Sequence, residues 1–251
     1  MVLVAEGSED AMSQQEWTAV DDYLAGALIE SDAALEAALA ASNAAGLPAI
    51  AVSSVQGKLL HLLAKLANAR RILEVGTLGG YSTIWLARAL PRDGRLITLE
   101  YQQKHADVAR ANIARAGLAD LVDIRVGAAL DMLPRLAQDL AAEPADPFDL
   151  VFIDADKVNL PDYFTWSVRL TRPGGVIIVD NVVRGGDVVN AHSEDLNVQG
   201  VRRLNEVMAA DPLVSATAIQ TVGVKGYDGF AIAIVGESQS ATPYVDREQP
   251  G

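Results

Sequence analysis

Two short polar runs contain the side chains best suited to hold a metal ion. Asp154-Ala-Asp156-Lys157 follows the hydrophobic residues 149–153, and Asp180-Asn181 follows the hydrophobic residues 176–179. If both hydrophobic runs are neighbouring parallel strands, their carboxyl ends meet at the sheet edge where open α/β proteins bind ligands. Carboxylate and amide oxygens with no His or Cys nearby suit Mg²⁺, Mn²⁺ or Ca²⁺ rather than Zn²⁺. The sequence therefore predicts a divalent-cation site formed by Asp154, Asp180 and Asn181.

These residues have a structural alternative, because Asp and Asn often form turns and helix caps. One such strand end alone would favour the alternative. Two adjacent ends with Lys157 beside them favour the metal site.

A glycine-rich segment from Glu74 to Ser82 leads from the hydrophobic residues 71–75 into a helical pattern. A tight strand-to-helix turn is its structural alternative, and it lacks the G-x-G-x-x-G pyrophosphate pattern. Glu100, at the end of residues 95–99, is placed to accept hydrogen bonds from ribose hydroxyls, as it would be in an NAD enzyme too. Glu74 would repel a pyrophosphate but suits a cationic head or a sulfonium. The two acids together favour S-adenosylmethionine.

A cation beside this ligand suggests a reaction. It would chelate two adjacent hydroxyls of an aromatic substrate and lower the pKa of the hydroxyl that attacks the sulfonium methyl group in line. Lys157 could accept the proton of that hydroxyl. A salt bridge to Asp154 or Asp156 is the alternative role of Lys157.

Short β-rich runs separated by helical stretches must position these groups. Strands alternating with helices, several of them apolar on both faces, predict a doubly wound parallel α/β sheet. The last two runs are joined by the turn-rich residues 223–228, so they should form an antiparallel hairpin. We expect one or two helices over residues 17–45, with Ser13 as N-cap, and another over 55–66. The expected strands are 71–75, 95–99, 122–126, 149–153, 176–179, 215–222 and 229–235.

Length and composition predict one domain over residues 16–236, with flexible tails at 1–15 and 237–251. Half of the 251 residues are hydrophobic, the net charge is −13, and cysteine is absent. The acidic balance argues against nucleic-acid binding, and the lack of cysteine excludes disulfides and thiolate chemistry. No apolar run reaches the roughly 18 residues of a membrane span, and we recognise no signal peptide. The expected partner is a small molecule and the expected location is the cytoplasm.

Several motifs together resemble one family, over roughly residues 48–236. The chain is similar to the cation-dependent O-methyltransferases that include caffeoyl-CoA and catechol O-methyltransferases, and most of all to their compact bacterial members. The motifs are Gln56-Gly57-Lys-Leu-Leu60, Leu73-Glu-Val-Gly-Thr77, Gly79-Gly-Tyr-Ser-Thr83, Gly127-Ala-Ala129, Phe152-Ile-Asp-Ala-Asp-Lys157, Asp180-Asn-Val-Val183 and Asp228-Gly-Phe230.

The resemblance implies a Rossmann-like class I methyltransferase fold, with a seven-stranded, mostly parallel sheet that has helices on both faces. It also implies a homodimer and a phenolic, vicinal-dihydroxy (catechol-type) substrate. Asp154, Asp180 and Asn181 would bind the metal, and Lys157 would be the catalytic base, assisted by Asp154 and Asn181. The implied contacts to S-adenosylmethionine are Val52, Glu74, Gly76, Thr77, Ser82, Glu100, Ala129, Asp154, Asp156 and Tyr163.

The chain departs from the family at a few positions. Arg184 stands where plant members have an aromatic residue, which disfavours an acyl-CoA substrate. We expect His61, His105 and His192 to be noncatalytic. His105 could stack near the adenine, but a surface helix cap is the favoured role. Arg202 and Asn205 could face the substrate, although solvated helix positions are the commoner case. The other functions considered are an NAD-dependent oxidoreductase and a noncatalytic nucleoside-binding module; the complete set of acids, amide and lysine favours the methyltransferase.

Overall fold

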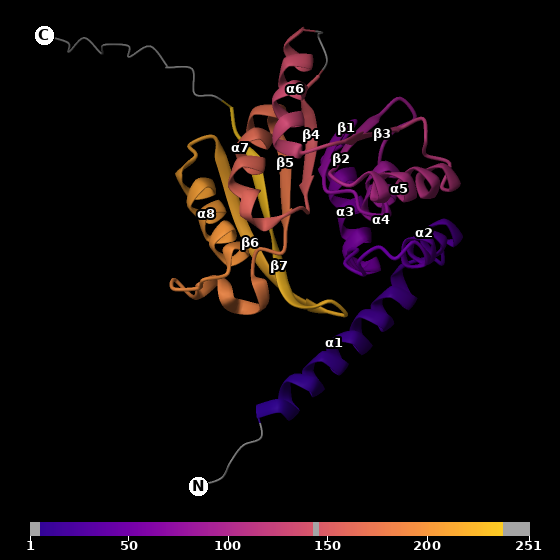
Figure 1. The fold of residues 1–251 in the computed structure, drawn as a ribbon, viewed down its shortest axis with the longest axis vertical. Helices are drawn as coiled ribbons and strands as arrows, with labels where there is room; N and C mark the ends of the chain where they lie inside the picture. Colours follow the sequence, from indigo (N-terminus) through magenta and orange to yellow (C-terminus); the bar gives the residue numbers. More distant parts are fainter. Residues whose placement is uncertain (1–5, 143–145, 238–251) are drawn as a thin grey trace, which may run out of the picture.

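The computed structural model describes residues 6–142 and 146–237, and a single seven-stranded sheet forms its centre (Figure 1). The strand order is β3-β2-β1-β4-β5-β7-β6. The first five strands are parallel, and β7 runs antiparallel to both β5 and β6. This confirms the predicted parallel sheet with its C-terminal hairpin. The strands are β1 (Arg71–Val75), β2 (Arg95–Glu100), β3 (Val122–Val126), β4 (Phe148–Ile153), β5 (Thr171–Asp180), β6 (Val214–Gly223) and β7 (Gly226–Val235).

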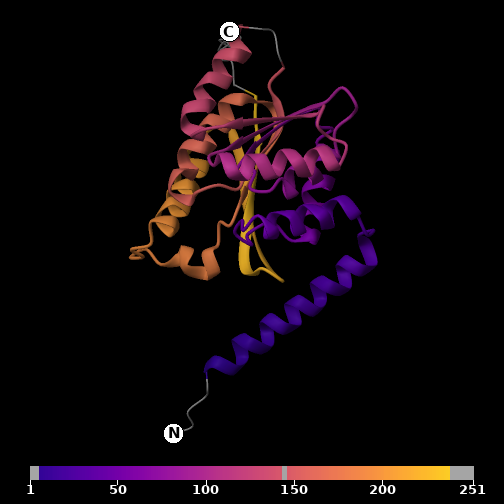
Figure 2. The same ribbon diagram turned by 45° about the vertical axis from the view of Figure 1, so that its right-hand side comes forward.

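Helices cover both faces of this sheet, as Figures 1 and 2 show. Alternate residues of a strand point to opposite faces. Leu73 and Val75 of β1 therefore pack in the core on the side of α6 to α8, while Ile72 packs in the core on the side of α2 to α5. Burial on both faces explains the nearly continuous hydrophobic runs of the central strands. The helices are α3 (Ser54–Leu66), α4 (Tyr81–Ala87), α5 (Gln103–Arg115), α6 (Ala129–Ala142), α7 (Leu160–Leu170) and α8 (Leu196–Ala210).

The N-terminal segment differs from the prediction. The helix α1 spans Glu6–Leu28, so Ser13 lies inside a helix and does not cap one, and much of the predicted N-terminal tail is helical. Asp32 instead caps α2 (Ala33–Ala44), accepting hydrogen bonds from Ala34 N and Leu35 N at 3.0 Å. Residues 1–5, a third of the predicted N-terminal tail, and residues 238–251, nearly all of the predicted C-terminal tail, lie outside the described residues.

The long helix α1 extends away from the sheet in both ribbon views (Figures 1 and 2). It is held at the turn of the β6–β7 hairpin, where Gln14 Nε2 donates to Gly223 O (3.1 Å) and Val224 N donates to Asp21 Oδ2 (2.8 Å). Within the described ranges, no helix has both the length and the hydrophobicity that crossing a membrane requires.

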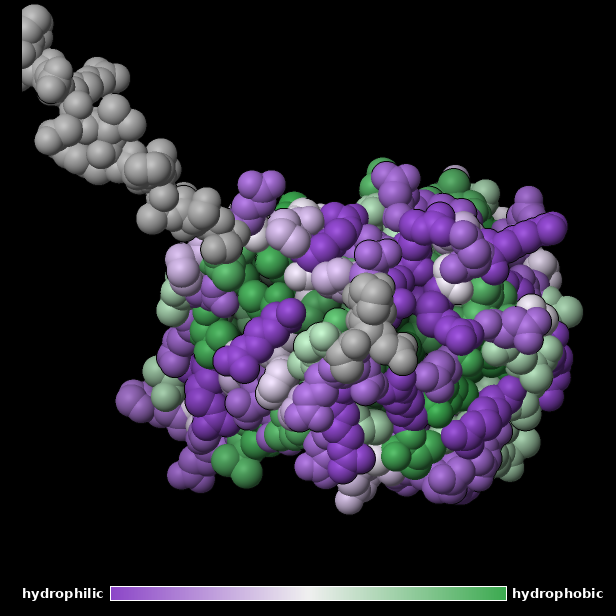
Figure 3. Space-filling model, turned by 90° about the horizontal axis from the view of Figure 1, so that it is seen from above, coloured by the Kyte–Doolittle hydropathy of each residue, from purple (hydrophilic) through white to green (hydrophobic). Residues whose placement is uncertain are grey.

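The strand order places a binding crevice beside β1. The chain winds from β1 outward to β3 and then crosses back to β4 on the other side of β1, and ligands in open α/β sheets bind at this kind of reversal. The crevice lies at the carboxyl ends of the parallel strands. Figure 3 looks onto the opposite end of the sheet, where hydrophilic side chains prevail over scattered hydrophobic ones.

Candidate active site

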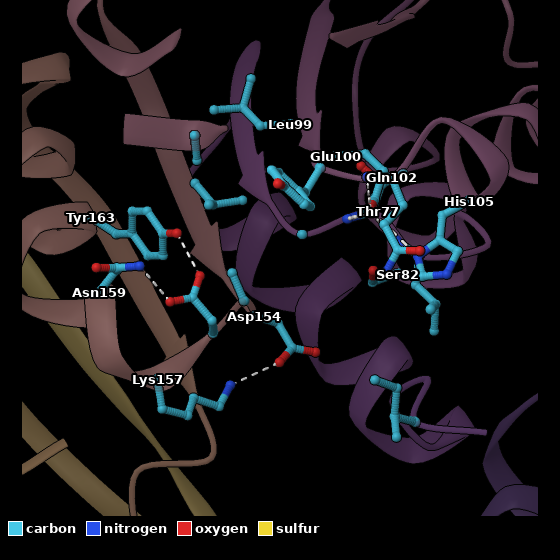
Figure 4. Close-up of a pocket in the computed structure, with 18 of the residues that line it drawn as sticks. Thr77, Ser82, Leu99, Glu100, Gln102, His105, Asp154, Lys157, Asn159 and Tyr163 are labelled. Carbon is cyan, nitrogen blue, oxygen red and sulfur yellow. Dashed lines mark hydrogen bonds and ion pairs between the residues drawn. The ribbon is translucent and has the colours of Figure 1, made fainter. Parts of the chain in front are cut away.

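A cavity of about 810 Å³ lies at the carboxyl edge of the sheet, between the segments that follow β1 to β5. In Figure 4, Glu100 and His105 lie on one side of it, Lys157 and Tyr163 on the other, and Asp154 between them. Most of the residues predicted to bind a ligand or metal line the cavity, namely Val52, Gly76, Thr77, Ser82, Glu100, Ala129, Asp154, Asp156, Lys157, Tyr163 and Asn181. The structure therefore brings residues from distant parts of the chain into one site.

Glu100 is held in a fixed orientation at one end of the cavity. Its Oε2 atom accepts hydrogen bonds from Thr77 N (3.2 Å) and Leu78 N (2.9 Å), and its Oε1 atom accepts one from Gln102 N (2.8 Å). Two of these donors belong to the glycine-rich segment. The carboxylate thus ties that segment to the end of β2 while its remaining lone pairs stay available to a ligand.

The favoured prediction for His105, a surface cap, is wrong, and its alternative, a position near the adenine, stays a prediction. Its side chain is only 11% exposed, it lines the cavity, and its Nδ1 atom lies 3.4 Å from Glu100 Oε1. The helix α5 starts directly beyond the end of β2, so its first turn faces back toward the carboxyl edge of the sheet. The sequence placed His105 on this turn, but only the helix phase shows which way it points.

Glu74 does not lie on the cavity wall, contrary to the predicted direct contact. It is fully buried, and its carboxylate accepts hydrogen bonds from the hydroxyls of Ser82 (2.7 Å), Thr83 (2.5 Å) and Thr98 (2.7 Å). Burial raises the pKa of Glu74 to about 7, although the three hydroxyl donors oppose this shift. Glu74 therefore holds the glycine-rich segment in place from the protein interior. Ser82, which donates to Glu74, lines the cavity itself.

Gly76 allows the segments after β1 and β4 to touch. Its φ is +99°, and a Cβ atom there would lie 2.1 Å from the backbone oxygen of Asp154. A side chain at this position would push the two segments apart. The close approach brings Asp154 beside the glycine-rich segment.

Asp154 and Lys157 form an ion pair on the wall, with Lys157 Nζ 3.1 Å from Asp154 Oδ1. This is the salt bridge considered as the alternative role of the lysine. Lys157 nevertheless lines the cavity, although only 7% of it is exposed. Asp156 is held separately, because Tyr163 Oη donates to its Oδ1 (2.5 Å) and Asn159 Nδ2 donates to its Oδ2 (2.6 Å).

Asp180 lies just behind the wall and is 5% exposed. Gln56 Nε2 donates to its Oδ2 (2.7 Å), and Asn181 N donates to its Oδ1 (2.8 Å). Burial, and then the negative charge of Asp154, raise the pKa of Asp180. The two carboxylates are therefore close enough to repel each other. Within residues 6–142 and 146–237, no three Asp, Glu, His or Cys side chains cluster as a metal site, so a cation here would need Asn181 as a further ligand.

Asp228 orders the segment that carries Asn181. Its Oδ1 atom accepts hydrogen bonds from Val183 N (2.9 Å), Arg184 N (3.0 Å) and Gly229 N (2.9 Å). This bonding holds the chain where β5 passes into η2 (Arg184–Val189), a segment with positive φ at Asn181 and Arg184. The Asp228-Gly-Phe230 motif thus supports the site from the neighbouring strand.

Replacing Asp228 by Ala is expected to lower kcat at this site at least about tenfold, because three backbone donors lose their acceptor and Asn181 moves. Asp228→Asn is the matched control, since its amide oxygen can still accept these bonds. Steady-state rates of both variants check this, together with the Kd for the nucleoside ligand expected at Glu100, which should change little. Equal rates for the two variants would contradict this role of Asp228.

Sequence reasoning missed several residues around the site. Gln56 stood in a recognised motif but had no role assigned, while Gln102 and Asn197 line the cavity unpredicted. Of the residues weighed as substrate contacts, Arg202 Nη1 donates to Val188 O (2.7 Å) and Asn205 lines a separate hollow beside β6, so neither is on the cavity wall. His61 and His192 are also outside it.

Comparison with known proteins places the chain in a family. Residues 30–232 match the family described as O-methyltransferase. A catechol O-methyltransferase of Niastella koreensis is 54% identical, covering 89% of this chain and all of that protein. A catechol O-methyltransferase of Mycobacterium tuberculosis is 57% identical, covering 86% of this chain and 94% of that protein.

Solved structures agree with this assignment. An O-methyltransferase from Bacillus cereus in complex with SAH is 57% identical, with a TM-score of 0.84, covering 88% of this chain and 99% of that one. The O-methyltransferase TomG from Streptomyces achromogenes, in complex with SAM, is 53% identical, with a TM-score of 0.85, covering 90% of this chain and all of that one. The resemblance drawn from the motifs is confirmed, and so is the class I methyltransferase fold: this chain belongs to the O-methyltransferase family.

Proposed function

We propose that this chain transfers the methyl group of S-adenosylmethionine to one hydroxyl of a vicinal dihydroxyphenyl compound, with the help of a divalent cation. One observation carries the proposal: a single cavity joins a nucleoside-type end at Glu100 to an acidic end at Asp154 and Asn181. The names of the relatives support it, since two are called catechol O-methyltransferases and two solved relatives hold SAH or SAM.

The nucleoside end would bind S-adenosylmethionine. The carboxylate of Glu100 would accept hydrogen bonds from the ribose hydroxyls, and Ala129 lies on the wall where the adenine would rest. Ser82 and Gly76 would contact the amino-acid part, close to Asp154. Bound there, S-adenosylmethionine would supply a methyl group on a positively charged sulfur.

The acidic end fits a divalent cation. Asp154 and Asp180 lie close together, and burial, followed by the negative charge of Asp154, raises the pKa of Asp180. A dication between them would remove this repulsion, and Asn181 offers a further hard oxygen donor. Such an ion would supply the positive charge that lowers the pKa of a substrate hydroxyl.

Lys157 would take the proton of that hydroxyl at Nζ. The lysine can do so only in its neutral form, and its present counterion is Asp154. If a cation engaged the carboxylate of Asp154, Lys157 would be released from its ion pair with that residue. The surrounding wall would exclude water and align the hydroxyl oxygen with the methyl group.

Metal affinity is expected to rise with pH. A raised carboxyl pKa means that Asp180 binds a proton more readily than an exposed carboxyl does, and this proton must leave before the cation can bind. Below the pKa of Asp180, each pH unit should weaken binding by up to about tenfold. Calorimetric titration with Mn²⁺ between pH 6 and 8 measures this, and a pH-independent Kd would contradict it.

The chain is also proposed to act as a homodimer on small phenols. The edge strand β6 supports an assembly: it spans Val214–Gly223, is mostly exposed and contains no charged residue. Long uncharged edge strands are usually covered. Sedimentation velocity should show a dimer at micromolar concentration, and a monomer would contradict this part of the proposal.

The test of the function uses labelled S-adenosylmethionine with Mg²⁺ and a panel of phenols. We expect the label to enter compounds with two adjacent hydroxyls and not their singly hydroxylated analogues. Fluorescence titration should show tight binding of S-adenosylhomocysteine and weak binding of NAD; the opposite order would indicate an oxidoreductase. Cofactor and metal binding without turnover of any phenol would indicate a noncatalytic module.

A further inference from the structure

Arg184 lies at the acidic end of the cavity. It follows Asn181 in the same segment and lines the same wall. Another residue of the wall, Asn197, lies in the first turn of α8, which packs against η1 (Lys157–Asn159). Arg184 therefore belongs to the part of the site where the acceptor would be bound, away from Glu100.

The backbone of Arg184 is fixed. Its φ is +57°, a left-handed conformation that a residue with a side chain adopts at some cost unless its surroundings impose it. Asp228 Oδ1 accepts the hydrogen bond from Arg184 N at 3.0 Å, and Val182 N donates to Gly229 O at 3.0 Å nearby. The backbone from which the arginine side chain extends is thus anchored to β7.

The guanidinium has donors to spare. Its Nη1 atom lies 3.8 Å from Asp228 Oδ2, which is too long for a hydrogen bond. Its Nε atom is buried and has no hydrogen-bond partner among the described residues. Buried donors normally have an acceptor, because leaving one unpaired costs free energy. A ligand in the cavity cannot reach this buried atom, but the side chain as a whole is 29% exposed and lines the cavity, so its outer nitrogens can donate to such a ligand.

The other charged groups of this wall are already engaged with each other or with neutral donors. Asp154 is paired with Lys157, and both oxygens of Asp156 accept hydrogen bonds from Tyr163 and Asn159. Within the described chain, Arg184 is therefore the positively charged residue of this wall that is bound most weakly by a carboxylate of the protein. A guanidinium recognises carboxylates in particular, because its planar array of donors matches the two carboxylate oxygens.

We propose that Arg184 determines acceptor specificity by binding a carboxylate on the substrate, so that dihydroxyphenyl acids are favoured over neutral or cationic catechols. The inference rests on the proposed function and specifies its substrate class. The two hydroxyls would face Asp154 and Asn181, and the carboxylate would pair with the guanidinium at the same end of the cavity.

The test compares 3,4-dihydroxybenzoate with 3,4-dihydroxybenzamide, which has nearly the same shape without the charge, and with catechol. The wild-type enzyme with Mg²⁺ should prefer the acid over the amide in kcat/KM by about tenfold or more, mainly through KM. Arg184→Gln should abolish this preference, and Arg184→Lys should keep part of it. Arg203→Gln removes a charge from an exposed position on α8 and should leave the preference intact.

The outcomes separate the two claims. Equal kcat/KM for acid and amide in the wild type would overturn the role of Arg184. An equal loss of kcat/KM on both compounds in Arg184→Gln would overturn it too, because such a loss indicates a structural effect on the loop. An unchanged Kd for S-adenosylhomocysteine verifies that the variant is folded. If the wild type methylates none of the three compounds, the proposed function fails and the inference fails with it.

Discussion

Replacing Asp154 by Ala is expected to lower kcat/KM for a dihydroxyphenyl acceptor by about a thousandfold, the scale of losing one preorganised electrostatic group. Asp154 is the junction of the site: its carboxylate pairs with Lys157 and repels Asp180, and its backbone oxygen touches Gly76. The substitution removes a charged ligand from the proposed metal site and leaves a buried lysine without its partner. Rates at saturating Mg²⁺, together with the Kd for Mn²⁺, measure the effect.

Two controls keep this result interpretable. Asp162→Ala removes the same charge from an exposed position on α7 and should leave the rate unchanged. Thermal denaturation of Asp154→Ala then shows how much stability is lost through the unpaired Lys157, which is buried although its partner Asp154 is 26% exposed. Activity within threefold of wild type in a folded Asp154→Ala variant would contradict the metal site.

Replacing Lys157 by Met is expected to lower kcat by about a hundredfold to ten-thousandfold, the usual contribution of a general base. Met has a similar length and suits the 7% exposure of the position. The Kd for Mn²⁺ should stay the same or fall, because a positive charge has left the neighbourhood of Asp154. The measurement is kcat against pH, and the variant should recover part of its rate at high pH, where the hydroxyl loses its proton without help.

Lys157→Arg separates charge from proton transfer. Arginine keeps the positive charge beside Asp154 but cannot lose a proton at accessible pH. It should therefore be as slow as Lys157→Met if the lysine is a base. An arginine variant with near wild-type kcat would show that the lysine serves only as the counterion of Asp154.

The fold was predictable because the hydrophobic runs marked the strands, and the alternation of strands and helices along the chain indicated how those strands pair. The strands β1 to β5 are short hydrophobic runs bounded by polar residues, and their order along the chain implies a parallel sheet. The pairing of the metal candidates followed from the same logic, because Asp154 and Asp180 end strands that prove to be neighbours.

The failures concern which way a side chain points. Glu74 alternates with Leu73 and Val75, and only the register of β1 on β2 places it opposite Thr98, beneath the glycine-rich segment. The direction of the His105 side chain depended on how α5 is rotated about its own axis. The anchoring of Arg184, which the sequence left unpredicted, depends on Asp228, 44 residues away in sequence. Such contacts are set by tertiary packing, and no short window of the sequence contains them.

The most direct test of the account is methyl transfer to a dihydroxyphenyl acceptor by protein stripped of metal. In the presence of a chelator the rate should fall by about a hundredfold or more, and adding excess Mg²⁺ or Mn²⁺ should restore it. S-adenosylhomocysteine should bind under both conditions, which shows that the nucleoside end is intact. An unchanged rate in the chelator would contradict the central claim that Asp154, Asp180 and Asn181 hold a cation needed for the reaction.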